Sequence, residues 1–395
     1  MHECFDVAVV GGGPVGTLAA LAFARLGLRS ALVEARAPGP PLGDGRVFAL
    51  AAGSVALLQG LAVWPRVAAA STAIRSVRVS AEGVFGTFRL DAEELALPAL
   101  GATVPAESLA SALEECQKTA PIRVFRPCAL LGIEARDALS DRLTLRLRGP
   151  DGMSSLEARL LLGADGAQSS VRRLAGIGAS ACGKPDRLLL ANLAGARARP
   201  HTAHLRFARD GAAALVPSGG GRLAGVLSLG GDADAAVEDP ARAFQARIGW
   251  SLGALRLLSP PRIHAVAPEQ AERLVGWRVV LIGQAAMSLH PLAAQGLNLA
   301  LRDLAALVEA VAQSEDPGAE RMLAAYEEAR LPEHRRTLGF VEGLRSWFGP
   351  PRASSLATAV GMLLCDRLGG IKHALAAWAS GLRPPVPALL RGVLP

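Results

Sequence analysis

The first 34 residues show a regular order of apolar runs and glycines. Residues 5–10 are a continuous apolar run that predicts a buried parallel strand, and a glycine turn follows at 11–16. The apolar positions of 14–27 predict a helix, and a second apolar run at 30–34 predicts the next strand. Strand, turn, helix and strand together make one complete βαβ unit.

The rest of the chain also mixes strand and helix patterns. An uncharged stretch at 47–65 predicts a buried helix, because its glycines and its final Pro65 argue against a membrane span. Strands that alternate with helices predict an α/β protein. The other predicted elements are a hairpin at 75–90, a helix at 107–118, two strands within 142–163, a strand at 277–283, a helix at 296–313 and a helical region from 317 onward.

Composition indicates a large folded protein. Of the 395 residues, 51% are hydrophobic and 19% are charged, which excludes a disordered chain and fits two closely joined domains. The net charge is +7, but aromatic residues make up 4% and no dense basic run occurs, so nucleic acid is not an expected partner. Dispersed cysteines and an N-terminus without a signal-peptide pattern predict free thiols and a cytoplasmic location. We expect no metal site, because His201 and His204 fall on opposite faces of a predicted strand.

The glycine turn of the βαβ unit carries the first chemical signal. Gly11, Gly13 and Gly16 stand in the G-x-G-x-x-G frame between a strand and a helix. The first glycine permits a tight turn, the second lets a pyrophosphate approach the backbone, and the third lets the helix pack on the strand. Glu34 ends the second strand, where a carboxylate accepts hydrogen bonds from ribose hydroxyls. The pattern predicts a dinucleotide site for an unphosphorylated adenosine ribose, as in FAD or NAD.

Two further glycine turns follow buried strands, GADGAQSSVR at 163–172 and GQAAMSLHPLAAQGLNLALRD at 283–303. In the first, Asp165 either caps a helix that starts near Ser169 or supports a ligand. In the second, a helix begins around Gly296, where its dipole favours a partly negative group. Either turn alone has an ordinary structural explanation, whereas the order and spacing of all three turns along one chain are specific.

With these three turns the chain resembles the flavoprotein aromatic monooxygenases of the p-hydroxybenzoate hydroxylase fold. Within that group it is most similar to the ubiquinone-biosynthesis ring hydroxylases, the 2-polyprenyl-6-methoxyphenol hydroxylase family. The resemblance covers essentially the whole chain. Besides the three turns, it rests on Asp44-Gly45-Arg46, on Trp64, and on His290-Pro291 before Gln295-Gly296.

The resemblance implies a Rossmann-like FAD-binding domain, an inserted β-sheet substrate domain and a helical C-terminus. The implied FAD-binding domain comprises 1–74, 100–182 and 270–345, the substrate domain 75–99 and 183–269, and the C-terminal segment 346–395. The implied activity is an FAD-dependent monooxygenase that hydroxylates the aromatic ring of a prenylated phenol in ubiquinone biosynthesis. Its other reactants would be molecular oxygen and NAD(P)H or another electron donor.

The resemblance also implies site residues. His290 would be the catalytic residue, near the substrate and steering a phenolic proton; the alternative is a histidine that anchors its loop by a hydrogen bond. The implied FAD contacts are Gly11, Gly13, Gly16 and Glu34 at the ADP half, Arg46, Asp165 and Gly166 along the pyrophosphate, Gly283 and Gln284 at the ribityl chain, and Gly296, Leu297 and Asn298 at the flavin ring.

Two alternative functions stay open at this point. One is another flavin oxidoreductase on the same fold, such as a reductase or a halogenase. The other is a flavin-poor structural component of a quinone-biosynthesis assembly. The second is suggested by Ala294, which stands where the family has glycine, and by Glu107, an acid near the expected pyrophosphate.

Residues 345–395 carry +5 of the net charge, and Trp347, Phe348 and Trp378 lie among the basic residues. An aromatic and basic helical segment predicts a peripheral contact with the anionic inner face of the cytoplasmic membrane. The alternatives are a covering helix with a solvated basic face, and a docking surface for other quinone-biosynthesis proteins.

Overall fold

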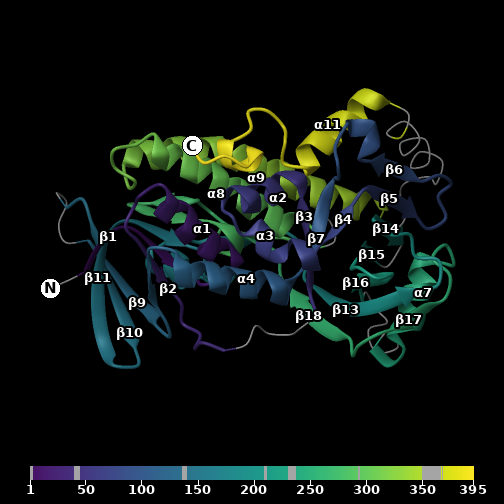
Figure 1. Cartoon of the computed structure of the whole chain (residues 1–395), viewed down its shortest axis with the longest axis horizontal. Coiled ribbons are helices and arrows are strands. Elements are labelled where there is room, and N and C mark those ends of the chain that lie inside the picture. The colour runs from purple at the N-terminus through teal and green to yellow at the C-terminus, as the bar shows by residue number, and fades with distance from the viewer. Residues whose placement is uncertain are drawn as a thin grey trace.

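The computed structural model describes residues 3–39, 45–135, 140–208, 211–229, 237–291, 294–348, 366 and 368–395. Two large sheets and two small ones are present in these residues. The large sheets lie toward opposite ends of the long axis, and helices pack across the middle of the molecule (Figure 1).

The first large sheet is mostly parallel. Its strands lie in the order β20 (Val275–Gly276), β21 (Val279–Leu281), β11 (Gly152–Gly163), β1 (Glu3–Val10), β2 (Ser30–Val33) and β8 (Ile122–Phe125). The antiparallel strands β10 (Leu143–Gly149) and β9 (Ala129–Ala135) extend it from β11. Strands β21, β11, β1, β2 and β8 run parallel. This arrangement confirms the α/β class and the parallel strands predicted near the N-terminus.

The second large sheet is antiparallel except for one pair, β14 and β5. The predicted hairpin at 75–90 is confirmed as β5 and β6 of this sheet. Its strands are β17 (Leu255–Leu257), β13 (Asp186–Gly195), β16 (Arg222–Ser228), β15 (Gly211–Pro217), β14 (Thr202–Ala208), β5 (Ser76–Ala81) and β6 (Phe88–Asp91), with β18 (Arg262–Val266) paired to β13.

Two three-stranded sheets complete the β structure. One is β3 (Val47–Ala51), β7 (Gly101–Pro105) and β4 (Thr72–Ile74); the other is β12 (Ala179–Ala181), β19 (Glu269–Ala271) and β22 (Met287–Ser288). The described helices are α1 (Pro14–Arg25), α2 (Ala52–Gly60), α3 (Trp64–Val67), α4 (Ala106–Thr119), α5 (Ser170–Leu174), α7 (Pro240–Ile248), α8 (Gln295–Ala312), α9 (Glu320–Phe348) and α11 (Gly369–Ala379).

Helix α1 is apolar around its circumference because it is buried between the first sheet and other helices. Residues 16–24 are all buried, and residues 18–23 share one hydrophobic cluster with Val7 and Val9 of β1 and Leu301 of α8. The other face of the sheet packs in a second cluster that includes Leu145 of β10. Both faces of the parallel sheet are thus covered, and each large apolar side chain buried there contributes about 1.5–3 kcal/mol.

The uncharged stretch 47–65 is not one helix, so that prediction is wrong. Its first five residues form β3, which pairs antiparallel with β7 before α2 begins. The two strands approach closely at Gly101, where a Cβ would collide with the carbonyl oxygen of Leu50. A strand partner from a distant segment provides backbone hydrogen bonds that the local apolar pattern does not reveal.

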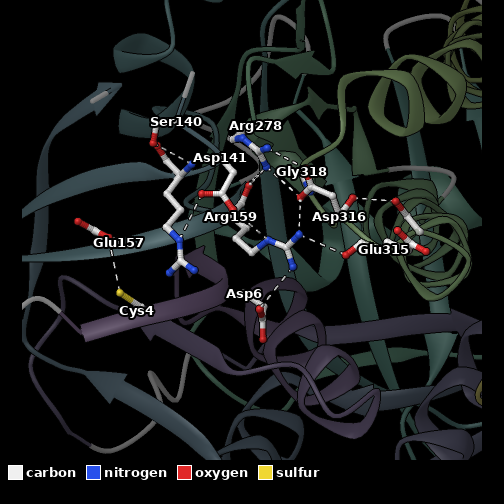
Figure 2. A network of polar contacts seen from close by, with 12 residues as sticks. Cys4, Asp6, Ser140, Asp141, Glu157, Arg159, Arg278, Glu315, Asp316 and Gly318 are labelled. Atoms are coloured by element: carbon white, nitrogen blue, oxygen red, sulfur yellow. Dashed lines mark hydrogen bonds and ion pairs between the residues drawn. The ribbon is translucent and has the colours of Figure 1, made fainter. Parts of the chain in front are cut away.

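An ion-pair network fastens the turn between α8 and α9 to the first sheet. In Figure 2 the guanidinium groups of Arg159 in β11 and of Arg278 point toward Asp316 in that turn. Arg278 donates to the two carboxylate oxygens of Asp316 at 3.0 and 2.7 Å. Burial raises the pKa of Asp316, but hydrogen bonds from Arg278 and from the Gly318 amide outweigh burial and hold that pKa below its usual value. The network keeps the pair of long helices in place over the sheet.

The C-terminal helix α11 packs against α9. Trp378 is only 8% exposed, its ring lies 4.7 Å from that of Phe340 between centroids, and its Nε1 donates to Glu333 at 3.1 Å. Lys372 is also buried, and its ammonium group pairs with Glu94. Because burial removes Trp378 from any surface, the prediction that it inserts into a membrane is wrong.

Several other residues of the predicted membrane segment lie outside the described part of the chain, namely Arg352 and Arg367 and the side chains of Arg345, Trp347 and Phe348. Asp44 of the Asp-Gly-Arg stretch lies outside it as well. Within the described residues, no helix combines the length and the hydropathy needed to cross a bilayer.

Candidate functional site

The three glycine turns meet at one edge of the first sheet. Val10 lies beside Gly163 and Val33, and Gly163 lies beside Leu281, so the carboxyl ends of four parallel strands are level. Backbone hydrogen bonds continue past these ends and join the turns to their neighbouring strands. Gly11 N donates to Val33 O at 2.8 Å, Ala164 N to Val10 O at 2.8 Å, and Ile282 N to Gly163 O at 3.0 Å. Segments that lie far apart in the sequence therefore form a single site, at the position where ligands bind in open α/β sheets.

Two glycines of the first turn are required by the packing of the protein itself. Gly11 has φ +109°, and a Cβ there would collide with the carbonyl oxygen of Ala164. A Cβ at Gly16 would collide with the carbonyl oxygen of Gly11. These two residues allow the helix to pack on the strand and the first turn to pack on the second.

Gly13 is a glycine for a different reason. Its backbone, at φ −71° and ψ −179°, suits any residue, and apart from its chain neighbours no described residue lies within 4 Å of a Cβ built there. Gly13 directly precedes helix α1, and within the described structure no side chain caps the first amides of that helix. The turn thus offers open space, amide donors and the positive end of a helix dipole, which together fit the pyrophosphate of a dinucleotide.

Glu34 lies at the end of β2 and is 8% exposed. Its Oε2 accepts a hydrogen bond from Gly12 N at 2.5 Å, and its Oε1 accepts from Arg36 N at 2.8 Å. The carboxylate therefore joins the glycine turn to the chain that leaves β2. This position beside the turn agrees with a carboxylate that faces a ribose.

In the second turn, Asp165 caps helix α5. Its Oδ2 accepts from the amides of Ser170 at 2.7 Å and Val171 at 3.2 Å, and its Oδ1 accepts from the Ser169 hydroxyl. This is the structural explanation already open from the sequence. The next residue, Gly166, has φ +90°, and no described atom lies within 4 Å of a Cβ built there.

The third turn ends at the start of α8. Ala294 adopts φ 50° and ψ 28°, the left-handed conformation that glycine adopts without steric cost and that alanine rarely adopts. Asn298 holds this helix start in place through its side chain. Its Oδ1 accepts from Ala51 N and the Ser54 hydroxyl, and its Nδ2 donates to Ala49 O and Ala294 O. The sequence indicated only the backbone of Asn298, because partners on β3 and α2 cannot be read from its own segment.

The other expected cofactor contacts lie around this edge with more exposure. Arg46 and Gln284 are exposed, and Gly283 is half-buried with φ 64°. Arg46 O accepts from Ala106 N at 2.9 Å, which brings Arg46 close to the first turn of α4. Glu107 lies in that same turn and is exposed.

His290 lies in the loop before α8 and is 1% exposed. Its Nε2 lies 3.0 Å from Asp186 Oδ2 in β13, and the same oxygen accepts from the Ser228 hydroxyl. Burial raises the pKa of Asp186, but hydrogen bonds from His290 and Ser228 outweigh it and hold that pKa below its usual value. The loop of the third turn is thereby joined to the second sheet.

An apolar row crosses the second sheet on the face that carries Asp186. Leu215 and Gly225, on the opposite face, pack near Phe244 of α7. The sequence did not reveal the row, since it takes one residue from each of five strands. Its members are paired side by side and partly exposed: Leu190, Val226, Ala214, Leu205 and Val79.

Comparisons with known proteins agree with this geometry. A family model described as an FAD binding domain matches residues 4–341. The ubiquinone hydroxylase UbiL of Rhodospirillum rubrum is 31% identical over 404 residues, which cover 98% of this chain and 93% of that protein. The 3-demethoxyubiquinol 3-hydroxylase of Escherichia coli is 28% identical and covers 95% of this chain and 98% of its own.

A solved structure shares the fold. The p-nitrophenol 4-monooxygenase PnpA of Pseudomonas putida DLL-E4 superposes with a TM-score of 0.75 at 19% identity and covers 99% of both chains. The fold and the resemblance inferred from the three turns are confirmed. The chain belongs to the FAD-binding family of flavin-dependent aromatic hydroxylases, in the group that contains the ubiquinone hydroxylases.

Proposed function

We propose that this protein hydroxylates the aromatic ring of a prenylated phenol in ubiquinone biosynthesis, with FAD, molecular oxygen and electrons from NAD(P)H or another donor. The observation that carries the proposal is one site built from three separated glycine turns, in a chain that aligns almost end to end with ubiquinone hydroxylases. FAD, when bound, supplies the chemistry by which oxygen is transferred to an electron-rich ring.

The residues of the protein bind and orient the cofactor. The open turn at Gly13 and the uncapped amides of α1 would bind the pyrophosphate, and Glu34 would accept from the ribose hydroxyls. The start of α8, held by the side chain of Asn298, would aim its amides and dipole at the partly negative ring edge. Further contacts in this proposal are Gly11, Gly16, Arg46, Asp165, Gly166, Gly283, Gln284, Gly296 and Leu297.

We assign the first sheet to the cofactor and the second sheet to the substrate, with the domain boundaries expected from the sequence. The apolar row on the second sheet supports a substrate with a hydrocarbon tail, because partly exposed Leu, Val and Ala side chains gain stability when an apolar group covers them. Such a group also keeps water away from the reacting ring.

His290 is assigned a positioning role in this proposal. Its buried contact with Asp186 holds the loop before α8 against β13, so it sets the spacing between the cofactor edge and the substrate face. A catalytic role would instead require the His290 ring to contact the phenol, whereas its Nε2 contacts the carboxylate of Asp186.

The test uses the purified, FAD-loaded protein with prenylated phenols of several tail lengths, NADPH and air. We expect NADPH oxidation that depends on the phenol and a product with one added ring oxygen, identified by mass spectrometry. NADPH oxidation without ring oxygen would favour another flavin oxidoreductase. A protein that binds no FAD would favour the structural component of an assembly.

Glu34→Ala should weaken FAD binding by roughly ten- to a hundredfold, since charge-assisted hydrogen bonds to ribose contribute about 1.5–3 kcal/mol. The measurement is the dissociation constant from flavin fluorescence quenching. Arg36→Ala is the matched control, because its pair with Glu34 lies on a side chain that is 63% exposed and such pairs contribute about 0–1 kcal/mol. An unchanged constant in Glu34→Ala would show that Glu34 only joins the turn to β2.

A prenylated phenol is carried by the lipid bilayer, so we also propose a peripheral contact with the cytoplasmic membrane. Trp378 and Lys372 are buried, and this contact therefore requires another surface.

A further inference from the structure

The most exposed large hydrophobic side chains of the described residues are Phe85 and Trp250, at 92% and 72%. Phe85 lies in the loop between β5 and β6, and Trp250 follows α7. Both loops belong to the end of the molecule that carries the second sheet, where Figure 1 labels β5, β6 and α7. Aromatic side chains this exposed in a folded protein mark a contact surface when they gather around one feature.

That feature is a cavity of about 160 Å³ to which both loops contribute. Thr87, two residues after Phe85, and Ser251, directly after Trp250, line it. Its floor is a pair of neighbouring parallel strands, with Arg78 beside His204 and Ser80 beside Arg206 on one face. Two guanidinium groups, an imidazole and three hydroxyls line the cavity together with Leu205 and Ile248, and among the described residues no carboxylate does.

Two polar atoms of this lining lack partners within the described structure. The Nε atom of Arg78 and the Nε2 atom of His204 are buried without a hydrogen bond. Such atoms destabilise a fold unless a ligand or water meets them. Burial and the nearby charges of Arg78 and Arg199 lower the pKa of His204 to about 4, so its imidazole is neutral at pH 7. Positive charge from the arginines remains, and an anion would compensate it.

We propose that this surface docks on a membrane, with the phosphate of an anionic phospholipid headgroup in the cavity and with Phe85 and Trp250 in the interface. Guanidinium groups suit phosphate oxygens, and aromatic rings suit the boundary between headgroups and acyl chains. The surface replaces the C-terminal segment as the predicted membrane contact. This membrane-docking proposal rests on the proposed function in one respect, namely that a prenylated substrate requires contact with a membrane.

The docking surface and the apolar row are two faces of one sheet. His204 and Leu205 are consecutive in β14, so their side chains point to opposite faces, one into the cavity and the other into the row. A bilayer bound at the cavity would therefore lie at the same end of the molecule as the substrate face, with the sheet between them.

The test is flotation of the FAD-loaded protein with phosphatidylcholine vesicles, with and without phosphatidylglycerol, at low and high salt. We expect binding to the anionic vesicles that falls as salt rises. The triple variant Phe85→Ser, Trp250→Ser, Arg206→Gln should lower the partition coefficient at least tenfold. Its FAD affinity and its turnover of a detergent-dispersed substrate should match the wild type.

The matched control is Trp277→Ser, Arg123→Gln, which removes an aromatic side chain that is 44% exposed and an arginine that is 61% exposed elsewhere on the surface. It should float like the wild type. The proposal is overturned by equal wild-type flotation with neutral and anionic vesicles, by no flotation, or by unchanged flotation of the triple variant. If sedimentation shows that the triple variant only dissociates an oligomer, the surface joins copies of this chain. Vesicle binding is measured without substrate, so its result is independent of the ring-hydroxylation result.

Discussion

Gly13→Val should abolish FAD binding, with a loss of affinity of at least a hundredfold, or about 2.7 kcal/mol. The backbone at position 13 suits valine, and apart from its chain neighbours no described residue lies within 4 Å of the new Cβ, so the protein itself has room for the side chain. The added methyl groups would occupy the space that we assign to the pyrophosphate. Flavin absorbance per protein and the dissociation constant for added FAD measure the effect.

The stability of the flavin-free variant separates this effect from misfolding. Because the valine meets open space, the free energy of unfolding of the apoprotein should change by less than about 0.5 kcal/mol. Added FAD should raise the melting temperature of the wild type but not that of the variant. Gly369→Val, at another glycine whose Cβ would meet no described atom within 4 Å, is the control and should bind FAD normally. Wild-type flavin content in Gly13→Val would contradict the assignment of this turn.

Asp303→Asn should lower the free energy of unfolding at pH 7 by about 3–5 kcal/mol, which is the cost of leaving a buried charge uncompensated. Asp303 lies in α8, is 1% exposed, and accepts from Arg330 Nε at 2.7 Å and His334 Nε2 at 2.8 Å, both in α9. An amide keeps the shape but removes the charge that balances the guanidinium. Urea denaturation of the apoprotein measures the change.

The contacts of Asp303 with Arg330 and His334 also make the free energy of unfolding depend on pH. Burial raises the pKa of Asp303, but the charges of His334 and Arg330 outweigh it and hold the pKa at about 2. A carboxylate with a lowered pKa stabilises the folded state above its unfolded pKa, and this stabilisation is lost as pH falls from about 4 to about 2. The gap between wild type and Asp303→Asn should therefore narrow over that interval. Glu134→Gln, which breaks a pair that is 54% exposed on each side, is the control and should cost less than about 1 kcal/mol. A similar cost for both variants would contradict the role given to Asp303.

Elements with local signals could be predicted closely from the sequence. The strands predicted within 142–163 are β10 and β11, because two apolar runs flank a glycine-containing turn. The helix expected at 296–313 is α8 at 295–312, because its apolar face repeats with helical spacing. The order of the three glycine turns also led to the family, since each follows a parallel strand and those strands end at one edge.

Features that depend on distant partners could not be predicted. Strand β3 forms by pairing with β7, and the side chain of Asn298 donates to the backbone of β3. Trp378 is buried because it packs against Phe340 and donates to Glu333, both in another helix. The basic and aromatic composition of the C-terminal segment indicated a surface, yet tertiary contacts place Lys372 and Trp378 inside. Composition records which residues are present, whereas burial depends on what packs against them.

The most direct test of ring hydroxylation is the origin of the oxygen atom in the product. The FAD-loaded protein is supplied with NADPH and a prenylated phenol under ¹⁸O₂ in ordinary water, and the product is analysed by mass spectrometry. The account predicts one ¹⁸O atom on the aromatic ring and none when the label is supplied as water. A product whose added oxygen comes from water, or NADPH oxidation that leaves the ring unchanged, would contradict it.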